Sequence, residues 1–69
     1  MAEVKISLAA ARVNAGLTQE EAAKLLKIGN RTLLNWEKGV AEPSFASLTM
    51  LSQIYGIPID NIFLPQKST

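Results

Sequence analysis

The stretch GLTQEEAAKLLKIGNRTLLNWEKG, residues 16–39, decides how this chain folds. It holds two segments whose apolar residues recur every three to four positions, the spacing of an amphipathic helix. The first segment opens with Thr18 and Glu21, which have the spacing of a capping box, and ends near Leu26. The second begins near Asn30. The stretch therefore predicts two short helices joined by a tight three-residue turn, which Ile28 anchors to the core.

Outward from this stretch, glycines and prolines divide the chain into further short helical segments. Ser7 and Ser44 are placed as N-caps, and Gly16 follows the first helix where a glycine is favoured. Five helices are predicted, near residues 7–15, 18–26, 30–38, 44–55 and 59–63, with a frayed tail over 65–69. The residues expected to face the core are Leu8, Ala11, Ala22, Ala23, Leu26, Leu33, Trp36, Phe45, Leu48, Leu51, Ile54 and Tyr55. The sequence thus predicts one compact all-α domain over residues 1–69.

Composition excludes several classes of function. The chain has 48% hydrophobic residues, which suits a packed core, and it contains neither cysteine nor histidine. Disulfides, Cys/His metal sites, thiol nucleophiles and the usual general base are therefore absent, so we expect no enzyme and no cofactor. No apolar run reaches the roughly 18–20 residues that cross a bilayer, and the first residues do not resemble a secretory signal. We expect a cytoplasmic protein without a membrane partner or an evident small-molecule ligand.

The net charge of +1 argues only weakly for nucleic acid, but the basic residues gather in the middle of the chain. The segment 24–38 holds Lys24, Lys27, Arg31 and Lys38 against the single acid Glu37. With Leu33 and Trp36 inward, the outward face of the helix near 30–38 carries Asn30, Arg31, Leu34 and Asn35. Arginine fits the acceptors of guanine, asparagine pairs with adenine, and leucine can contact a thymine methyl group. A solvated polar face explains the same residues without a ligand, and the pattern alone leaves both interpretations open.

The order of residues resembles the Cro/phage-repressor (XRE-like) helix-turn-helix family over about residues 6–64. The resemblance rests on residues 16–28, on Thr32-Leu33, on Trp36-Glu37-Lys38-Gly39, on Pro43-Ser44, and on the closing segments 51–56 and 59–63. It implies a lambda-repressor-like fold and a sequence-specific transcriptional regulator, a repressor that reads double-stranded DNA through the major groove with its third helix.

The resemblance also implies roles for matching positions. The base-reading positions are Gly29, Asn30, Arg31, Leu34 and Asn35, and the phosphate-contacting positions are Thr18, Gln19, Lys27, Lys38 and Gly39. Arg12 and Glu37 match a pair that the family often buries as a salt bridge. The chain departs from the family pattern at Lys27, where a turn glycine is common, at Gly29, where Ser or Thr usually caps the helix, and at Glu42, in a loop that is often basic.

The main alternative is a protein-interaction module of the same fold, such as an antitoxin-type or bridging factor with secondary DNA binding. The low net charge and the acidic Glu42 favour it slightly. Under either function a homodimer is expected, because one recognition helix covers only a few base pairs. The dimer candidates are the apolar residues Ile57, Pro58, Ile59, Phe63 and Leu64. The alternative is that this apolar end simply closes the core, which is the favoured interpretation for Ile62 and Phe63.

Overall fold

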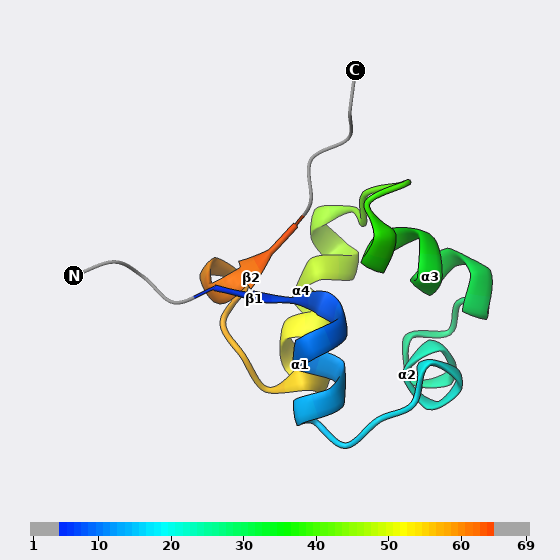
Figure 1. Ribbon diagram of the computed structural model, residues 1–69, viewed down its shortest axis with the longest axis horizontal. Coiled ribbons are helices and arrows are strands. Elements are labelled where there is room, and N and C mark those ends of the chain that lie inside the picture. Colours follow the sequence, from blue (N-terminus) through cyan, green and yellow to red (C-terminus); the bar gives the residue numbers. More distant parts are fainter. Residues whose placement is uncertain (1–4, 65–69) are drawn as a thin grey trace.

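Four α-helices and a pair of two-residue strands make up residues 5–64, the part of the chain that the computed structural model describes (Figure 1). In chain order the elements are β1 (Ile6–Ser7), α1 (Leu8–Asn14), α2 (Gln19–Leu26), α3 (Asn30–Lys38), α4 (Phe45–Tyr55), the 3-10 helix η1 (Ile59–Asn61) and β2 (Ile62–Phe63). The tail predicted over 65–69 lies outside the described residues.

Local capping explains why the helices begin where they do. The Ser7 hydroxyl accepts from the amide of Ala10, and the Ser44 hydroxyl accepts from the amide of Ser47. Thr18 completes the predicted capping box with Glu21: its hydroxyl accepts from the Glu21 amide at 3.1 Å, and its own amide donates to Glu21 Oε1 at 2.9 Å. The three N-caps expected from the sequence are thereby confirmed.

The helices enclose a single cluster of buried side chains. Its members are Leu8, Ala11, Ala22, Ala23, Leu26, Leu33, Trp36, Leu51, Tyr55 and Ile62. The expectation that Phe45 joins them is wrong, because its side chain is 73% exposed. At roughly 100° per residue, Phe45 lies about 120° around α4 from Leu51 and about 80° from Tyr55, so it falls outside the stripe that these buried residues form.

The predicted helical domain is confirmed in its main lines, but the fifth helix expected near residues 59–63 is only a short 3-10 helix followed by a strand. Only three residues form a 3-10 turn after Pro58, where the amide of Asn61 donates to the Pro58 carbonyl. Ile62 is already extended, with φ −92° and ψ 125°. It pairs in parallel with Ile6 at the other end of the described chain. The side chain of Ile62 is buried in the core, and its β-branched shape favours the extended conformation.

The strand pair and the α2–α3 unit lie on different sides of the molecule. In Figure 1 the strands are on the left, against α1, whereas α2 and α3 are on the right. Helices α1 and α4 lie between them, and α4 supports both α2 and η1. Within residues 5–64, no helix combines the length and the hydropathy needed to span a bilayer.

Candidate nucleic-acid interface

The turn between α2 and α3 is fixed by backbone hydrogen bonds and by one apolar anchor. Lys27 ends α2 in the left-handed conformation, with φ 60° and ψ 42°. The amide of Ile28 then returns to the carbonyl of Ala23 at 3.0 Å, the long bond typical of a helix end of this kind. The Ile28 side chain is half-buried against the core. The two helices are therefore held at a defined angle through a turn of only three residues.

Helix α3 presents two distinct faces. Leu33 and Trp36 are buried, and the opposite side of the helix carries Arg31, Leu34, Asn35 and Lys38. Of the predicted base-reading residues, Gly29, Asn30 and Arg31 are exposed, whereas Leu34 and Asn35 are half-buried. Within the described residues, no side-chain hydrogen bond or ion pair engages Asn30, Arg31, Asn35 or Lys38. These polar groups are available to a ligand that approaches α3.

The beginning of α3 lacks a side-chain cap. Gly29 is the N-cap residue, and the first turn contains no acidic side chain. Its φ of −80° is open to any residue, and a Cβ built there would meet nothing within 4 Å. Neither the backbone nor the space around it explains the glycine. Because Gly29 has no side chain, the first backbone amides of α3, next to Asn30 and Arg31, are left uncovered.

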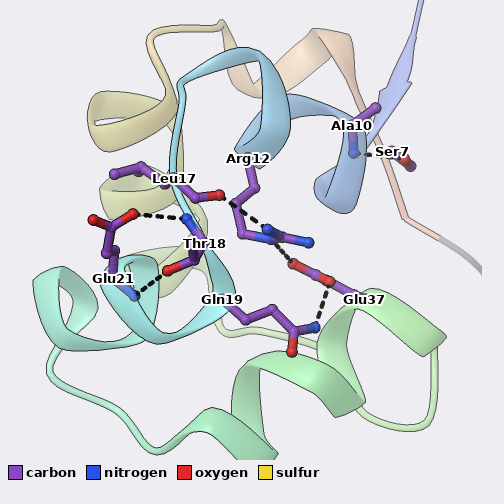
Figure 2. Close-up of polar contacts among 8 residues, drawn as sticks. All are labelled: Ser7, Ala10, Arg12, Leu17, Thr18, Gln19, Glu21 and Glu37. Atoms are coloured by element: carbon purple, nitrogen blue, oxygen red, sulfur yellow. Dashed lines mark hydrogen bonds and ion pairs between the residues drawn. The ribbon is translucent and has the colours of Figure 1, made fainter.

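At the start of α2, the side chain of Gln19 is half-buried between α2 and α3. Its Nε2 donates to Oε1 of Glu37 at 2.9 Å (Figure 2). The neighbouring Thr18 is exposed, and its hydroxyl accepts the capping bond. The first side chain of α2 is thus hydrogen-bonded to α3. The sequence did not predict this contact between Gln19 and Glu37.

The same carboxylate binds Arg12. Arg12 Nε lies 2.8 Å from Glu37 Oε2, and the two side chains expose 14% and 6% of their surface. Arg12 Nη1 donates in addition to the carbonyl oxygen of Leu17, in the loop before α2. One guanidinium therefore connects α1, this loop and α3, as Figure 2 shows. Removing one partner of a buried ion pair typically costs about 3–5 kcal/mol.

Tyr55 lies within electrostatic reach of this pair. Burial, together with the negative charge of Glu37, raises the pKa of the Tyr55 phenol to about 12, and Arg12 opposes the shift. The hydroxyl is buried and makes no hydrogen bond to the described residues. The phenol is therefore neutral at physiological pH and acts there as part of the core.

The loop after α3 folds back onto its carboxyl end. Gly39 takes φ 79°, and the amides of Val40 and Ala41 both donate to the carbonyl of Asn35. Lys38 is exposed at the last turn, so a basic side chain stands at this end of α3. Glu42 is exposed in the same loop, where it would oppose an anionic ligand.

The predicted dimer residues are not brought to the same side as α3. Phe63 and Pro58 are exposed, whereas Ile57, Ile59 and Leu64 are half-buried. They belong to η1, β2 and the adjoining turns, which lie away from α3 in Figure 1. Ile57 and Leu64 also pack against the core, so only part of each side chain is open to a second copy.

Sequence reasoning missed two features of the candidate interface. The first is Thr32, which is exposed on α3 although it lies only about 40° around the helix from the buried Trp36, so helical spacing alone does not indicate its exposure. The Gln19–Glu37 contact joins residues far apart in sequence, and no local pattern indicates it. Among the described residues there is no cluster of acidic side chains that could hold a metal ion.

Comparison with known proteins agrees with this geometry. A model of the helix-turn-helix family matches residues 8–62, and the chain belongs to this family, in its Cro/phage-repressor (XRE-like) branch. The chain is 44% identical over 50 residues to the HTH-type transcriptional regulator ImmR of Bacillus subtilis (strain 168), a match that covers 72% of this chain and 39% of ImmR.

Two further relatives extend the comparison. The cryptic phage CTXphi transcriptional repressor RstR of Vibrio cholerae is 40% identical over 48 residues, which cover 70% of this chain and 43% of RstR. An uncharacterized HTH-type transcriptional regulator of Methanocaldococcus jannaschii is 35% identical over 48 residues, 70% of this chain and 73% of that protein. The chain thus spans about two fifths of the length of ImmR and RstR. No solved structure matches it significantly.

Proposed function

We propose that the chain is a sequence-specific DNA-binding transcriptional regulator, a repressor that places α3 in the major groove of double-stranded DNA. The observation that carries this proposal is the outward side of α3, where Asn30, Arg31 and Asn35 have no partner within the described residues. These are the side-chain types that pair with guanine and adenine edges. The names of ImmR and RstR describe a transcriptional regulator and a transcriptional repressor, which supports the same function.

In this proposal the residues divide into two groups. Base edges are read by Gly29, Asn30, Arg31, Leu34 and Asn35, and phosphates are contacted by Thr18, Gln19, Lys27, Lys38 and Gly39. Arg12 and Glu37 do not contact DNA and instead hold α3 in place, which their 2.8 Å ion pair supports. Regulation follows from occupying DNA, so no catalytic step and no cofactor are proposed.

We further propose that residues 1–69 act as one unit in the cytoplasm and bind a two-fold operator as a homodimer. The surface for a second copy would be Ile57, Pro58, Ile59, Phe63 and Leu64. Because this surface lies away from α3 in Figure 1, two copies could pair there while each α3 remains free to enter a groove.

The decisive experiment is selection of bound duplexes from a random DNA pool at near-physiological salt, followed by sequencing. A two-fold motif with half-sites about one helical turn apart is expected for a dimeric operator-binding regulator. An enriched motif without two-fold symmetry would keep DNA recognition and overturn the dimer.

A second candidate function, a protein-interaction module, is supported by one surface feature. Val40 and Phe45 are 58% and 73% exposed on either side of the acidic Glu42, which is a combination that suits a protein surface better than a phosphate backbone. If no motif is enriched from the random pool, this candidate replaces the first.

A further inference from the structure

The carboxylate of Glu37 accepts hydrogen bonds from two sides, and each oxygen has its own donor. Oε2 accepts from Arg12 Nε at 2.8 Å, and Oε1 accepts from Gln19 Nε2 at 2.9 Å. Figure 2 shows Glu37 between the two donors, with Arg12 reaching it from α1 and Gln19 from the beginning of α2. A group on α3 therefore determines how the first side chain of α2 lies.

This contact fixes the orientation of the Gln19 amide. A primary amide has two N–H donors on one side and a carbonyl oxygen on the other. A carboxylate can accept only from the donors, so the carbonyl oxygen of Gln19 must turn away from Glu37. One N–H is used by Glu37, and one N–H remains for a ligand at the start of α2.

Charge compensation makes such an arrangement compatible with an approaching phosphate. An isolated carboxylate next to Gln19 would repel a phosphate, but the guanidinium of Arg12 is paired with it at 2.8 Å. Arg12 also holds the Leu17 carbonyl, two residues before Gln19. The loop, the start of α2 and α3 are thereby joined through one ion pair.

We propose that Glu37 is a positioning residue for DNA binding: it holds Gln19 so that its free Nε2 hydrogen faces a DNA phosphate, and it thereby links that phosphate contact to the placement of α3. This inference rests on the proposed DNA-binding function and adds a role to Glu37 beyond its ion pair with Arg12. Gln19 contributes one hydrogen bond to the phosphate and keeps its bond to Glu37 in the complex.

The first test follows the side-chain amide of Gln19 by NMR in the unaltered protein. In the free protein, the hydrogen bond to Glu37 should change the chemical shift of one of the two Nε2 protons and protect that proton from exchange with solvent. When a selected duplex is added, the second Nε2 proton should also become protected from exchange, and the first should remain protected. Loss of protection at the first proton on binding would show that Gln19 leaves Glu37, and would overturn the proposal.

The second test is a double-mutant cycle measured as affinity for the selected duplex. Gln19→Met keeps the length of the side chain and removes its donors, so it should weaken binding by about tenfold, the effect of one hydrogen bond to a charged group. In a Glu37→Gln background, the new side-chain amide has one oxygen, which accepts from Arg12, and one NH₂ group, which faces Gln19 and cannot accept its hydrogen bond. Gln19→Met should then have less than about a twofold effect, because the donor is no longer held toward the phosphate.

A destabilised control separates positioning from folding. Leu51→Ala removes a buried side chain of α4 that takes no part in the hydrogen bonds among Arg12, Glu37 and Gln19. In that background Gln19→Met should retain its full effect. An equal effect of Gln19→Met in the wild-type and Glu37→Gln backgrounds overturns the inference while DNA binding stands. If Glu37→Gln does not fold, the NMR experiment decides alone. If the wild-type protein enriches no duplex sequence, the proposed DNA-binding function itself is wrong.

Discussion

Lys27 and Gly29 lie at the two ends of the turn between α2 and α3, and of the two it is the lysine, not the glycine, that takes the left-handed backbone conformation. Lys27 is left-handed at φ 60° and is the one non-glycine residue with positive φ among residues 5–64. Gly29, two positions later, has the ordinary extended φ of −80°. A glycine would relieve backbone strain at position 27, but the turn has its glycine at position 29, where the backbone is not strained.

Replacing Lys27 by glycine should have opposite effects on stability and on DNA binding. A side chain in the left-handed region is strained, so Lys27→Gly should raise the free energy of unfolding by about 0.5–1 kcal/mol. If Lys27 contacts a phosphate, the slope of log affinity against log salt should fall by about 1. Thermal denaturation and binding at several salt concentrations measure the two effects.

The matched control is Lys27→Asn, because asparagine tolerates the left-handed conformation and carries no charge. It should reproduce the change in salt dependence. Unchanged salt dependence in both variants would remove Lys27 from the phosphate-contacting group.

Replacing Gly29 by serine should stabilise the domain. The serine hydroxyl would supply the missing N-cap of α3 and raise the free energy of unfolding by about 0.3 kcal/mol. Gly56 is the matched control, because a Cβ there also meets nothing within 4 Å but its φ is +73°. Gly56→Ser should therefore destabilise by about 1 kcal/mol. Equal shifts in melting temperature for the two variants would contradict the role assigned to the backbone angle.

Arg31→Ala should weaken binding to the selected operator by about 1–3 kcal/mol and relax the preference at one base pair. The reason is that Arg31 is exposed on the outward side of α3 without an intramolecular partner in the described residues. Quantitative binding to the operator and to single-base variants measures both effects. Lys24→Ala, at an exposed position of α2 outside the proposed interface, should leave them unchanged. Equal losses on operator and random duplexes would make Arg31 a phosphate contact.

Alkaline pH should destabilise the protein through Tyr55. Its pKa is about 12 in the folded protein against 10.0 for the free group, chiefly because the phenol is buried. Below pH 10 the phenol is neutral in both states. Between pH 10 and about 12 only the unfolded chain releases the proton, so this contribution to the free energy of unfolding falls as pH rises. Comparison with Tyr55→Phe isolates the contribution of the phenol.

Denaturant unfolding of both proteins from pH 8 to 12 measures this difference. The Tyr55→Phe variant should lose stability less steeply above pH 10. Parallel curves for the two proteins would show that the phenol titrates alike in the folded and unfolded chains.

The features that could be predicted from sequence are those fixed by neighbours within one helical turn. The caps at Ser7, Thr18 and Ser44 need only residues three positions away, and the inward positions of Leu33 and Trp36 follow from helical spacing. Phe45 was misplaced because an apolar residue at the edge of a stripe looks, in sequence, like one at its centre.

The features that sequence could not predict depend on residues far apart in the chain. The pairing of Ile6 with Ile62 involves two residues from each strand, too few for an alternating pattern to develop. The contact of Gln19 with Glu37 depends on the angle between α2 and α3. The ion pair of Arg12 with Glu37 was expected from the family resemblance, which supplied long-range information that spacing alone does not contain.

The parallel direction of β1 and β2 determines how the domain bears mechanical load. The chain enters β1 at Ile6 and leaves β2 after Phe63, with Ile6 beside Ile62 and Ser7 beside Phe63. Tension applied between the two ends therefore pulls the strands along their own length in opposite directions, and the bonds between them are loaded together in shear. Force transmitted through the chain reaches the strand pair, on the side away from α3, before it reaches the helices.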